Sequence, residues 1–443
     1  MKVTILGGGL AGLSLAYFLQ DEEAIREIEI IEKEATCGGL CRSFSLDGVY
    51  WDIGPHILFS KNEETLDFML RLLNGNNAKI RRSNRILHSG RKVQYPFEND
   101  LSKLPEDDRE FCVNAFLNNP YEDYNPANML QFFLHTFGEG ITNLYLRPYN
   151  EKIWKFDPSF LDLQMVGRIP KPPREDIINS ASGQTLDGYL HQLYFHYPMQ
   201  GGIQALVHAF ADCLDKKISI STGESMISVQ KTDDGFIIET NSRNLTSNHL
   251  ISTIPVNELC MQYSGAPDSI QAAGDCLRYN SIAVIIMQLS KDFAGDNFAF
   301  MIADKNVIFH RISKIDFLGQ AYHKENTVTL MIEITYRKND IISKYTDDEL
   351  INKAIDGLHK VRFMDSDTVV INSTVKRFDY AYVVYDLMHK SNMERIRNYF
   401  TGQGVYLNGR FGNFEYLNMD AVIDESRKLS VQIKDSIRKE VFK

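Results

Sequence analysis

The opening segment KVTILGGGLAGLSLAYFLQ, residues 2–20, constrains the fold more than any other part of the chain. Residues 2–6 have the apolar, β-branched character of a buried strand, and residues 10–20 have the apolar spacing of a helix. Three glycines stand between them, and residues 28–32 (IEIIE) form a second predicted strand that ends in an acid. The order strand, glycine turn, helix, strand predicts a parallel α/β unit.

The glycine spacing makes this unit a predicted dinucleotide site. Gly7, Gly9 and Gly12 fit the pattern G-x-G-x-x-G. Such glycines allow a tight turn, close approach of the backbone to a pyrophosphate, and close packing of the helix on the strand. The N-terminus of the helix then directs free N–H groups toward the phosphates. Glu32 follows Gly12 by twenty residues and can accept hydrogen bonds from a ribose hydroxyl pair. The segment therefore predicts a Rossmann-type site for FAD or NAD.

A second glycine pair separates these two cofactors. Gly38 and Gly39 follow Glu32 closely, and Arg42 comes soon after them. Glycines allow the backbone to run beside a ligand, and an arginine can neutralise phosphate or bond to a flavin edge. The alternative for Arg42 is a surface ion pair. The two-part arrangement is similar to the FAD site of the flavoprotein superfamily of amine oxidases, phytoene desaturases, protoporphyrinogen oxidases and sugar mutases.

Four segments resemble, in the same order, motifs of the UDP-galactopyranose mutases. GPHILFSKNEETLDFML at residues 54–70 resembles the family's GPHIFHT segment, and RKVQYPFENDLSKLP at residues 91–105 resembles the segment around its Y-P-F motif. LRPYNEKIWKFDPSFLDLQMVGRIP at residues 146–170 resembles the R-P-Y-N-x-K-x-W segment and the arginine that follows it. GRFGNFEYLNMD at residues 409–420 resembles the C-terminal G-R-x-G-x-x-x-Y-x-x-M-D. These segments span nearly the whole chain, and their order indicates membership of this family.

The resemblance implies an α/β fold, with a Rossmann-type FAD-binding domain, a helical subdomain and an antiparallel β-sheet subdomain. We expect the FAD-binding domain to be discontinuous, because a β-rich insertion follows the Rossmann start. The predicted boundaries are residues 1–75, 200–255 and 400–443 for the FAD-binding domain, 76–199 for a mainly helical substrate subdomain, and 256–399 for a β-sheet substrate subdomain. Composition alone predicts a loop at residues 171–183, which makes that segment a candidate lid.

The resemblance also implies an isomerase reaction. Mutases of this family use reduced FAD to interconvert the pyranose and furanose forms of a nucleotide sugar, as in UDP-galactopyranose and UDP-galactofuranose, with no net redox change. Flavin N5 attacks the anomeric carbon as the nucleoside diphosphate leaves, and the sugar opens and recloses as a five-membered ring. The cofactor performs the covalent chemistry, so the protein groups position the substrate and stabilise charge. Such a product belongs to the biosynthesis of cell-surface polysaccharides.

The positions that match the family motifs give the candidate site. The expected FAD contacts are Gly7, Gly9, Leu10, Ala11, Gly12, Glu32, Lys33, Gly38, Gly39, Leu40, Arg42, His56, Gly409, Arg410, Asn418 and Met419. The expected substrate contacts are Trp154, Arg168, Tyr385, Arg410, Tyr416 and Glu98, and the expected catalytic residues are Arg168, Arg410 and His56. Two arginines from different segments can clamp one diphosphate. No metal site is expected, because no group of cysteines and histidines has metal-ligand spacing.

Each of the main assignments has a purely structural alternative. Arg168 also fits a surface charge at the end of a helix, and Arg410 also fits a flavin or backbone contact. Trp154 fits a place in the core equally well, and Tyr385 and Tyr416 fit buried aromatic positions with bonded hydroxyls. His56 fits a structural histidine held by a hydrogen bond.

The chain departs from the family pattern at three positions. Phe59 stands in place of the second histidine of GPHIFHT, which lies near the flavin in the family. Asn418 stands where many bacterial mutases carry Asp, and Glu98 stands where eukaryotic-type mutases carry Gln near the uracil. A carboxylate accepts hydrogen bonds but cannot donate them, so we hypothesise that Glu98 changes the preference for the base or the sugar.

Composition and charge exclude other classes of function. The 443 residues carry a net charge of −10, which argues against nucleic-acid binding. A basic run is typical of a solvated face, with a wall that attracts an anionic ligand as the alternative; it comprises Lys79, Arg81, Arg82, Arg85, Arg91 and Lys92. Six scattered cysteines predict reduced thiols in a cytoplasmic protein. No apolar run is long enough to predict a transmembrane segment.

Two rival functions stay open beside the mutase. The segments YAYVVYDL and YPMQGGIQAL are also at home among protoporphyrinogen-oxidase-like proteins, so an FAD-dependent oxidase or desaturase is the main alternative. A non-catalytic FAD-binding protein is the third, although it would need only the FAD glycines and none of the substrate-side motifs. A mutase requires a nucleotide-diphosphate sugar and an external reductant such as NAD(P)H or a reductase. The sequence leaves open whether the chain forms a homo-oligomer.

Overall fold

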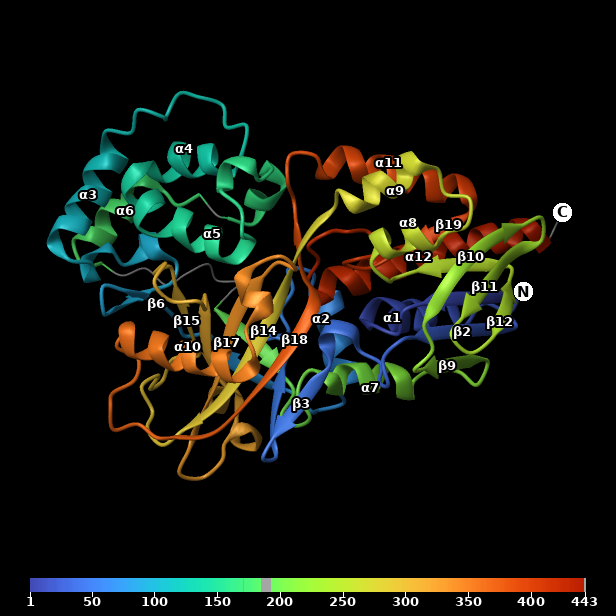
Figure 1. Cartoon of the computed structure of the whole chain (residues 1–443), viewed down its shortest axis with the longest axis horizontal. Coiled ribbons are helices and arrows are strands. Elements are labelled where there is room, and N and C mark those ends of the chain that lie inside the picture. The colour runs from blue at the N-terminus through green and yellow to red at the C-terminus, as the bar shows by residue number, and fades with distance from the viewer. Residues whose placement is uncertain (170, 185–192, 442–443) are drawn as a thin grey trace.

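The computed structural model describes residues 1–169, 171–184 and 193–441. A parallel five-stranded sheet in the order β19-β13-β1-β2-β9 forms its first layer (Figure 1). The strands are β1 (Lys2–Leu6), β2 (Glu27–Glu32), β9 (Ile218–Thr222), β13 (His249–Ser252) and β19 (Val405–Leu407). Segments from the beginning, the middle and the end of the chain therefore build one sheet of the Rossmann type.

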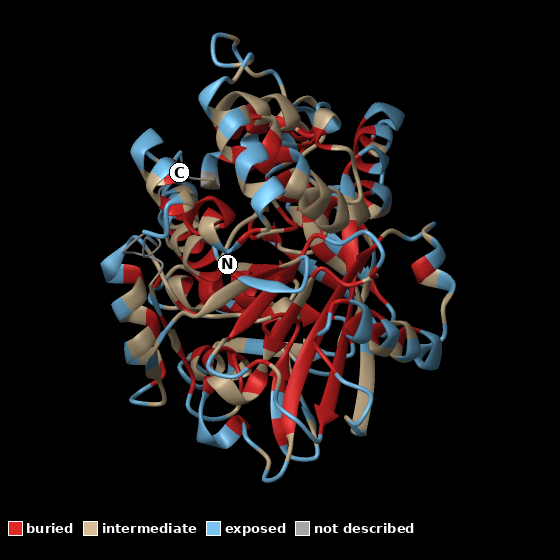
Figure 2. Cartoon of the chain, turned by 90° about the vertical axis from the view of Figure 1, so that its left-hand side faces the viewer, coloured by how far each residue is buried: buried red, intermediate tan, exposed pale blue. Residues whose placement is uncertain are grey.

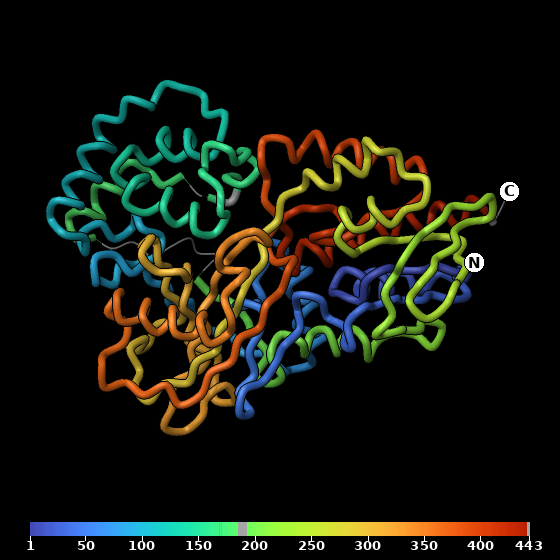
Figure 3. The backbone as a smooth tube through the Cα atoms, viewed as in Figure 1, coloured from blue at the N-terminus to red at the C-terminus, as the bar shows by residue number. Residues whose placement is uncertain are grey.

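Four helices cover one face of this sheet. They are α1 (Leu10–Leu19), α2 (Glu63–Leu72), α7 (Gln204–Asp212) and α12 (Met419–Val441). Helix α1 is buried around most of its circumference because it lies between the sheet and α12, and the hydroxyls of Ser14 and Ser426 join the two helices at 2.9 Å. The first and last helices of the chain thus run side by side, and both termini lie at the same end of the molecule (Figure 3).

The opposite face carries a β-ribbon and three more helices. The ribbon comprises β10 (Met226–Thr232), β11 (Gly235–Thr240) and β12 (Asn244–Ser247), and the helices are α8 (Val256–Gln262), α9 (Asp268–Asp275) and α11 (His389–Gln403). The alternating segment MISVQKTDDGFIIET predicts a hairpin about its Asp-Asp-Gly turn, and the pairing of Thr232 with Gly235 confirms it. The next strand, β13, leaves the ribbon and pairs in parallel with β1, because its residues are buried on both sides.

A seven-stranded sheet in the order β18-β14-β17-β16-β15-β6-β7 forms the second layer. Its strands are β6 (Asn84–His88), β7 (Arg91–Gln94), β14 (Arg278–Leu289), β15 (Ala299–Ile302), β16 (Arg311–Lys314), β17 (Val328–Tyr336) and β18 (Val370–Val384). Neighbouring strands are antiparallel except β15 and β6. Strands β6 and β7 join this sheet from residues 84–94, within the segment expected to be mainly helical.

Both faces of the seven-stranded sheet are covered, so its central strands β14 and β17 are buried along most of their length (Figure 2). Helix α10 (Asp347–Lys360) packs on one face and begins with a capping box between Thr346 and Glu349. The hairpin of β3 (Ser43–Leu46) and β4 (Val49–Asp52) packs on the other face, as does β8 (Tyr194–Tyr197), which pairs with β5 (Ala78–Arg81).

A layer of helices with an aromatic core completes the fold. It comprises α3 (Glu106–Leu117), α4 (Met129–Ile141), α5 (Arg147–Trp154) and α6 (Arg174–Ala181), at the upper left of Figure 1. Phe132, Phe133 and Phe137 of α4 are buried in this core. Short 3-10 helices connect these segments, including Leu163–Arg168.

The predicted loop at residues 171–183 is wrong, because α6 occupies most of it. Pro173 is at the N-cap position, where a missing N–H costs nothing, and Glu175 and Asp176 favour the positive end of the helix dipole. Ile177 and Ser180 are buried against the neighbouring elements, and the Ser180 hydroxyl donates to the backbone oxygen of Glu98 at 2.7 Å. The packing of this short helix therefore outweighs its loop-like composition.

The predicted fold class is confirmed: the protein has an α/β fold with a Rossmann-type sheet, a helical layer and a largely antiparallel sheet. The domain boundaries stay a prediction. All six cysteines are free thiols. Within the described ranges, no helix combines the length and the apolar character that crossing a membrane would need. The basic run is mostly a solvated face, because Lys79, Arg81, Arg91 and Lys92 are exposed.

Candidate functional site

A cavity of about 1110 Å³ lies at the carboxyl ends of the five parallel strands, where open α/β sheets bind their ligands. Residues that follow the five strands line it: Gly7 after β1, Lys33 after β2, Glu224 after β9, Thr253 after β13 and Arg410 after β19. Strand β18 of the seven-stranded sheet contributes another part of the wall. The site is therefore assembled from both sheets.

The two glycine motifs form a cradle of bare backbone at this edge. The N–H of Gly38 donates to the carbonyl of Gly8 at 2.9 Å, and a Cβ added to Gly39 would lie 3.3 Å from the Cα of Gly9. Gly7 has φ +100°, and a Cβ on Gly12 would lie 2.0 Å from the Gly7 oxygen. Only glycine permits these approaches, so the residues present fit the pyrophosphate of a dinucleotide.

Glu32 anchors the cradle to the end of β2. Its Oε2 accepts the N–H of Gly8 at 2.7 Å and its Oε1 accepts the N–H of Glu34 at 2.8 Å. The carboxylate lines the cavity, and each of its oxygens has a further lone pair for a ribose hydroxyl. Its contact with the cofactor stays a prediction.

Arg42 forms the ion pair that was its structural alternative, and it also lines the cavity. Its Nη1 donates to Glu34 at 2.8 Å, and its Nε donates to the carbonyl of Gly39 at 3.0 Å. The guanidinium lies 5.9 Å from the ring centroid of Phe44 and lines the cavity. The ion pair thus holds the arginine against the second glycine motif, where its charge faces the cradle.

His56 lies in the cavity wall with its imidazole neutral. Its Nδ1 is 3.1 Å from the carbonyl of Gly54. Burial, followed by the nearby charge of Arg410, lowers the pKa of His56 to about 3. A neutral ring that donates from Nδ1 leaves Nε2 as an acceptor. His56 therefore offers a hydrogen-bond acceptor at neutral pH and carries no charge there.

Arg410 lines the cavity, but its three guanidinium nitrogens all donate to backbone carbonyls. Its Nε and Nη2 donate to the carbonyl of Leu417, and its Nη1 donates to the carbonyl of Ala381 at 3.1 Å. The guanidinium also lies 4.7 Å from the ring centroid of Tyr416. Arg410 therefore braces the segment after β19 and adds a positive charge to the cavity.

The segment that Arg410 braces contains most of the remaining predicted cofactor contacts. Asn418 and Met419 line the cavity, as does the predicted substrate contact Tyr416, whereas Gly409 packs behind it, with an added Cβ only 2.5 Å from the Cβ of Ala11. Of the predicted FAD contacts, Gly12 and Gly409 thus shape the wall, and the following residues line it: Gly7, Gly9, Leu10, Ala11, Glu32, Lys33, Gly38, Gly39, Leu40, Arg42, His56, Arg410, Asn418 and Met419.

Of the predicted aromatic contacts, Tyr416 lines the cavity, and Trp154 and Tyr385 lie behind it. The ring of Trp154 meets those of Tyr382 and Tyr416 edge-on at 5.9 and 5.8 Å, and the hydroxyl of Tyr385 accepts the backbone N–H of Tyr416 at 2.6 Å. Trp154 and Tyr385 do not line the cavity. They pack against or bond to Tyr382 and Tyr416, which do line it. Arg168 ends a 3-10 helix, and its side chain lies outside the part that the structure describes.

Glu98 and Phe59 show how the departures from the family pattern are accommodated. Glu98 is 4% exposed and is not among the residues that line the cavity; burial raises the pKa of its carboxyl to about 7. Phe59 lines the cavity, and the guanidinium of Arg82 lies 5.3 Å from its ring centroid. Arg82 is thus the member of the basic run that turns inward, with no hydrogen-bond partner at Nε or Nη2 among the described residues.

Sequence reasoning missed an ion pair in the cavity wall. Arg311 of β16 lines the cavity, and both oxygens of Glu333 on β17 accept from its guanidinium. No motif pointed to Arg311. Glu333, however, is the charged residue inside the apolar run VTLMIEITY, and a fully buried carboxylate almost always has a partner. A glutamate within this apolar strand was therefore the sequence signal that could have indicated the ion pair.

Comparisons with known proteins agree with this geometry. A sequence profile of the flavin-containing amine oxidoreductases matches residues 10–398. The fold is similar to that of reduced UDP-galactopyranose mutase, with 24% identity, a TM-score of 0.90 and coverage of 98% of this chain and 93% of that one. It is also similar to a candidate protoporphyrinogen oxidase from Exiguobacterium sp. 255-15, with 15% identity, a TM-score of 0.78 and coverage of 98% and 99%.

Two further similarities are more distant or shorter. A redesigned putrescine oxidase has 13% identity, a TM-score of 0.64 and coverage of 98% of each chain. An uncharacterised protein from the nifH2 3′ region of Methanothermococcus thermolithotrophicus is 40% identical over 74 residues, which are 17% of this chain and 67% of that protein. The profile match covers most of the chain and agrees with the glycine cradle, so the protein belongs to the flavin-containing amine oxidoreductase family, shares its fold with UDP-galactopyranose mutase, and uses FAD.

Proposed function

We propose that the protein is an FAD-dependent nucleotide-sugar mutase of the UDP-galactopyranose type, which interconverts pyranose and furanose forms without net redox change. The observation that carries the proposal is that one cavity contains the glycine cradle and four arginines, of which Arg311 and Arg410 are the candidates for the substrate's diphosphate. Its volume of about 1110 Å³ exceeds the roughly 300–1000 Å³ of a pocket for one small ligand. The cavity has room for a dinucleotide and an anionic second ligand.

In this proposal the chain's own residues bind and orient the substrate. Bound FAD, when reduced, supplies the nucleophilic nitrogen N5 for the anomeric carbon. Arg311 and Arg410 place positive charge where a nucleoside diphosphate must be held and released. His56 keeps its proton on Nδ1, where it meets the Gly54 carbonyl, so Nε2 accepts from a sugar hydroxyl or a flavin N–H.

The remaining predicted contacts take narrower roles in this proposal. Tyr416 contacts the substrate from the cavity wall, and Trp154 and Tyr385 hold it in place through ring packing and a hydrogen bond. Arg168 remains our second candidate for the diphosphate clamp, and Glu98 remains our candidate for the choice of base. The electron donor is NAD(P)H or a reductase, and the site of action is the cytoplasm, in agreement with six free thiols.

The alternative is an FAD-dependent oxidase, which the family profile and the similarity to the candidate protoporphyrinogen oxidase favour. One experiment separates the two. The flavin is reduced without oxygen, UDP-galactopyranose and other nucleotide sugars are added, and the products are separated by chromatography. The mutase forms a furanose isomer while the flavin stays reduced. In a parallel reaction that starts from the oxidised enzyme, reduction of the flavin by an added amine or porphyrinogen, with peroxide released in air, would support the oxidase and contradict the mutase.

A further inference from the structure

Glu333 occupies a position where a carboxylate is costly to bury. It lies in the middle of β17, in which every residue is buried, and its own side chain has no exposed surface. His310 approaches Oε2 only to 3.9 Å, and burial keeps the pKa of His310 well below its ordinary value, so that imidazole is neutral. Among the described residues, Arg311 is therefore the cation that balances Glu333.

The register of the sheet fixes this ion pair. Arg311 on β16 and Glu333 on β17 are direct cross-strand partners, so their side chains leave the same face of the sheet side by side. Nε of Arg311 donates to Oε1 at 2.6 Å, and Nη2 donates to Oε2 at 2.5 Å. This two-point contact prevents the guanidinium from turning about its long axis.

The contact uses only one edge of the guanidinium. Of its five N–H donors, the second one of Nη2 and one of Nη1 lie side by side on the adjoining Nη1/Nη2 edge. The Arg311 side chain is 24% exposed and lines the cavity, whereas Glu333 is fully buried behind it. The second edge is thus the one that a ligand in the cavity can reach, and two parallel N–H groups suit two oxygens of a phosphate.

The ion pair also contacts the loop that carries His56. A Cβ added to Gly54 would lie 3.3 Å from Oε2 of Glu333 and 3.5 Å from Nη2 of Arg311. Gly54 has φ +78°, and its carbonyl is the group that His56 contacts. The backbone before His56 therefore rests on the Arg311–Glu333 pair, which connects the anion-binding arginine to the imidazole.

We propose that Glu333 is a positioning residue: by holding the Nε/Nη2 edge of Arg311, it directs the Nη1/Nη2 edge into the cavity as a two-pronged site for the diphosphate of the substrate. The inference rests on the proposed function, which supplies that diphosphate. An arginine that is already fixed loses less side-chain freedom on binding than a mobile one, so the buried carboxylate strengthens the binding of an anion despite its own negative charge.

The test measures the affinity of the FAD-loaded enzyme for UDP. Glu333→Gln keeps the volume of the side chain and removes one acceptor and the charge, and we expect the Kd for UDP to rise on the order of ten-fold. The KM for UDP-galactopyranose should rise in parallel, with a smaller change in kcat. Arg311→Ala should weaken UDP binding further. In the double variant, UDP should bind no more weakly than to Arg311→Ala, because Glu333 acts through Arg311.

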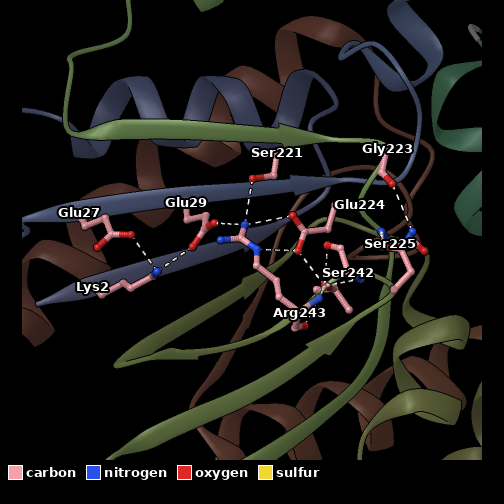
Figure 4. Close-up of polar contacts among 11 residues, drawn as sticks. Lys2, Glu27, Glu29, Ser221, Gly223, Glu224, Ser225, Ser242 and Arg243 are labelled. Atoms are coloured by element: carbon pink, nitrogen blue, oxygen red, sulfur yellow. Dashed lines mark hydrogen bonds and ion pairs between the residues drawn. The ribbon is translucent and has the colours of Figure 1, made fainter.

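A matched control is available in the other sheet. Glu29 of β2 is also buried and also paired, with Arg243 and Lys2 (Figure 4), but it does not line the cavity. Glu29→Gln should lower the thermal unfolding temperature as a lost buried ion pair does, and leave the affinity for UDP unchanged. FAD content and the thermal unfolding temperature of every variant separate a loss of positioning from a loss of folding.

If Glu333→Gln binds UDP as tightly as the wild type does, the inference is wrong. It is also wrong if the fold-losses of UDP affinity in the two single variants multiply in the double variant. If Glu333→Gln does not fold with FAD, Glu333→Asp takes its place. That variant retains a carboxylate and should bind UDP more tightly than Arg311→Ala; equal loss contradicts positioning. A wild-type enzyme that binds UDP but forms no furanose refutes the proposed function alone. Failure to bind both UDP and inorganic pyrophosphate refutes both.

Discussion

A polar or charged residue within an apolar segment is the sequence signal that distinguishes single residues of the site. The resemblance to mutase motifs found His56 and Arg410, because these stand in short, distinctive segments. It did not find Arg311 or Glu333, whose partnership depends on the register of two strands and not on any local pattern. A carboxylate inside VTLMIEITY predicts a partner, but its identity appears only when the sheet is assembled.

The two arginines assigned to the clamp from sequence give a first prediction. Arg168→Ala and Arg410→Ala should each weaken UDP binding by about 2 kcal/mol, the size of a lost charge-assisted hydrogen bond. Arg410→Ala should also lower the FAD content, because its guanidinium holds the carbonyls of Leu417 and Ala381. Titration of both variants with UDP measures this loss. Unchanged affinity for UDP in both variants would show that these two arginines do not clamp the diphosphate.

Glu98 gives a prediction about pH. Burial raises the pKa of its carboxyl from the ordinary 4.5 to about 7, so the folded protein holds this proton more tightly than the unfolded chain does. The stabilisation is complete below pH 4.5 and is lost as the pH rises through about 7. Glu98→Gln should therefore exceed the stability of the wild type by less than about 1 kcal/mol at pH 5 and by about 3 kcal/mol at pH 8.

Chemical unfolding at both pH values measures this difference. The control is Glu110→Gln, which changes an exposed glutamate on α3 and should leave the pH dependence of stability unchanged. If the stability of Glu98→Gln follows the wild type in parallel from pH 5 to pH 8, Glu98 is not the buried acid described above.

At the scale of elements, the sequence predicted those whose signal is local. The first strand, the glycine turn and the first helix follow from spacing alone, as does the hairpin between β10 and β11. Strands β15 and β6 were missed because they are short and pair across more than two hundred residues. Helix α6 was missed because its stability comes from tertiary packing, which composition does not record.

The close contact of α1 with β1 gives a prediction at this scale. In Gly12→Ala, the new Cβ would lie 2.0 Å from the oxygen of Gly7, so the helix must move away from the strand and the cradle must distort. We expect a lower FAD content and a loss of stability of about 1–3 kcal/mol. Absorbance of bound flavin and thermal unfolding measure both quantities.

Gly402 supplies the matched control for this substitution. It lies in α11, and a Cβ there would meet nothing within 4 Å. Gly402→Ala should retain its FAD and be as stable as the wild type or slightly more stable, because alanine is the better helix former. Equal FAD content in Gly12→Ala and Gly402→Ala would contradict the role assigned to the cradle.

For the whole molecule, the function depends on how two sheets share one cavity. The parallel sheet supplies the glycine cradle and Glu32, and the seven-stranded sheet supplies Arg311 and the wall formed by β18. The sequence predicted the first half well, because dinucleotide sites are built from consecutive elements. It did not predict Arg311 or the wall formed by β18, because strand pairing brings together residues from 311 to 382 in that wall.

In the proposed function, this cavity isomerises a nucleotide sugar on a flavin that stays reduced. The most direct measurement adds excess UDP-galactopyranose to the anaerobically reduced enzyme, and follows the furanose formed and the flavin spectrum together. We predict that many molecules of furanose form per flavin while the spectrum remains that of reduced FAD, and that the oxidised enzyme forms none. Flavin reoxidation in step with product, or no furanose from the reduced enzyme, would contradict the claim.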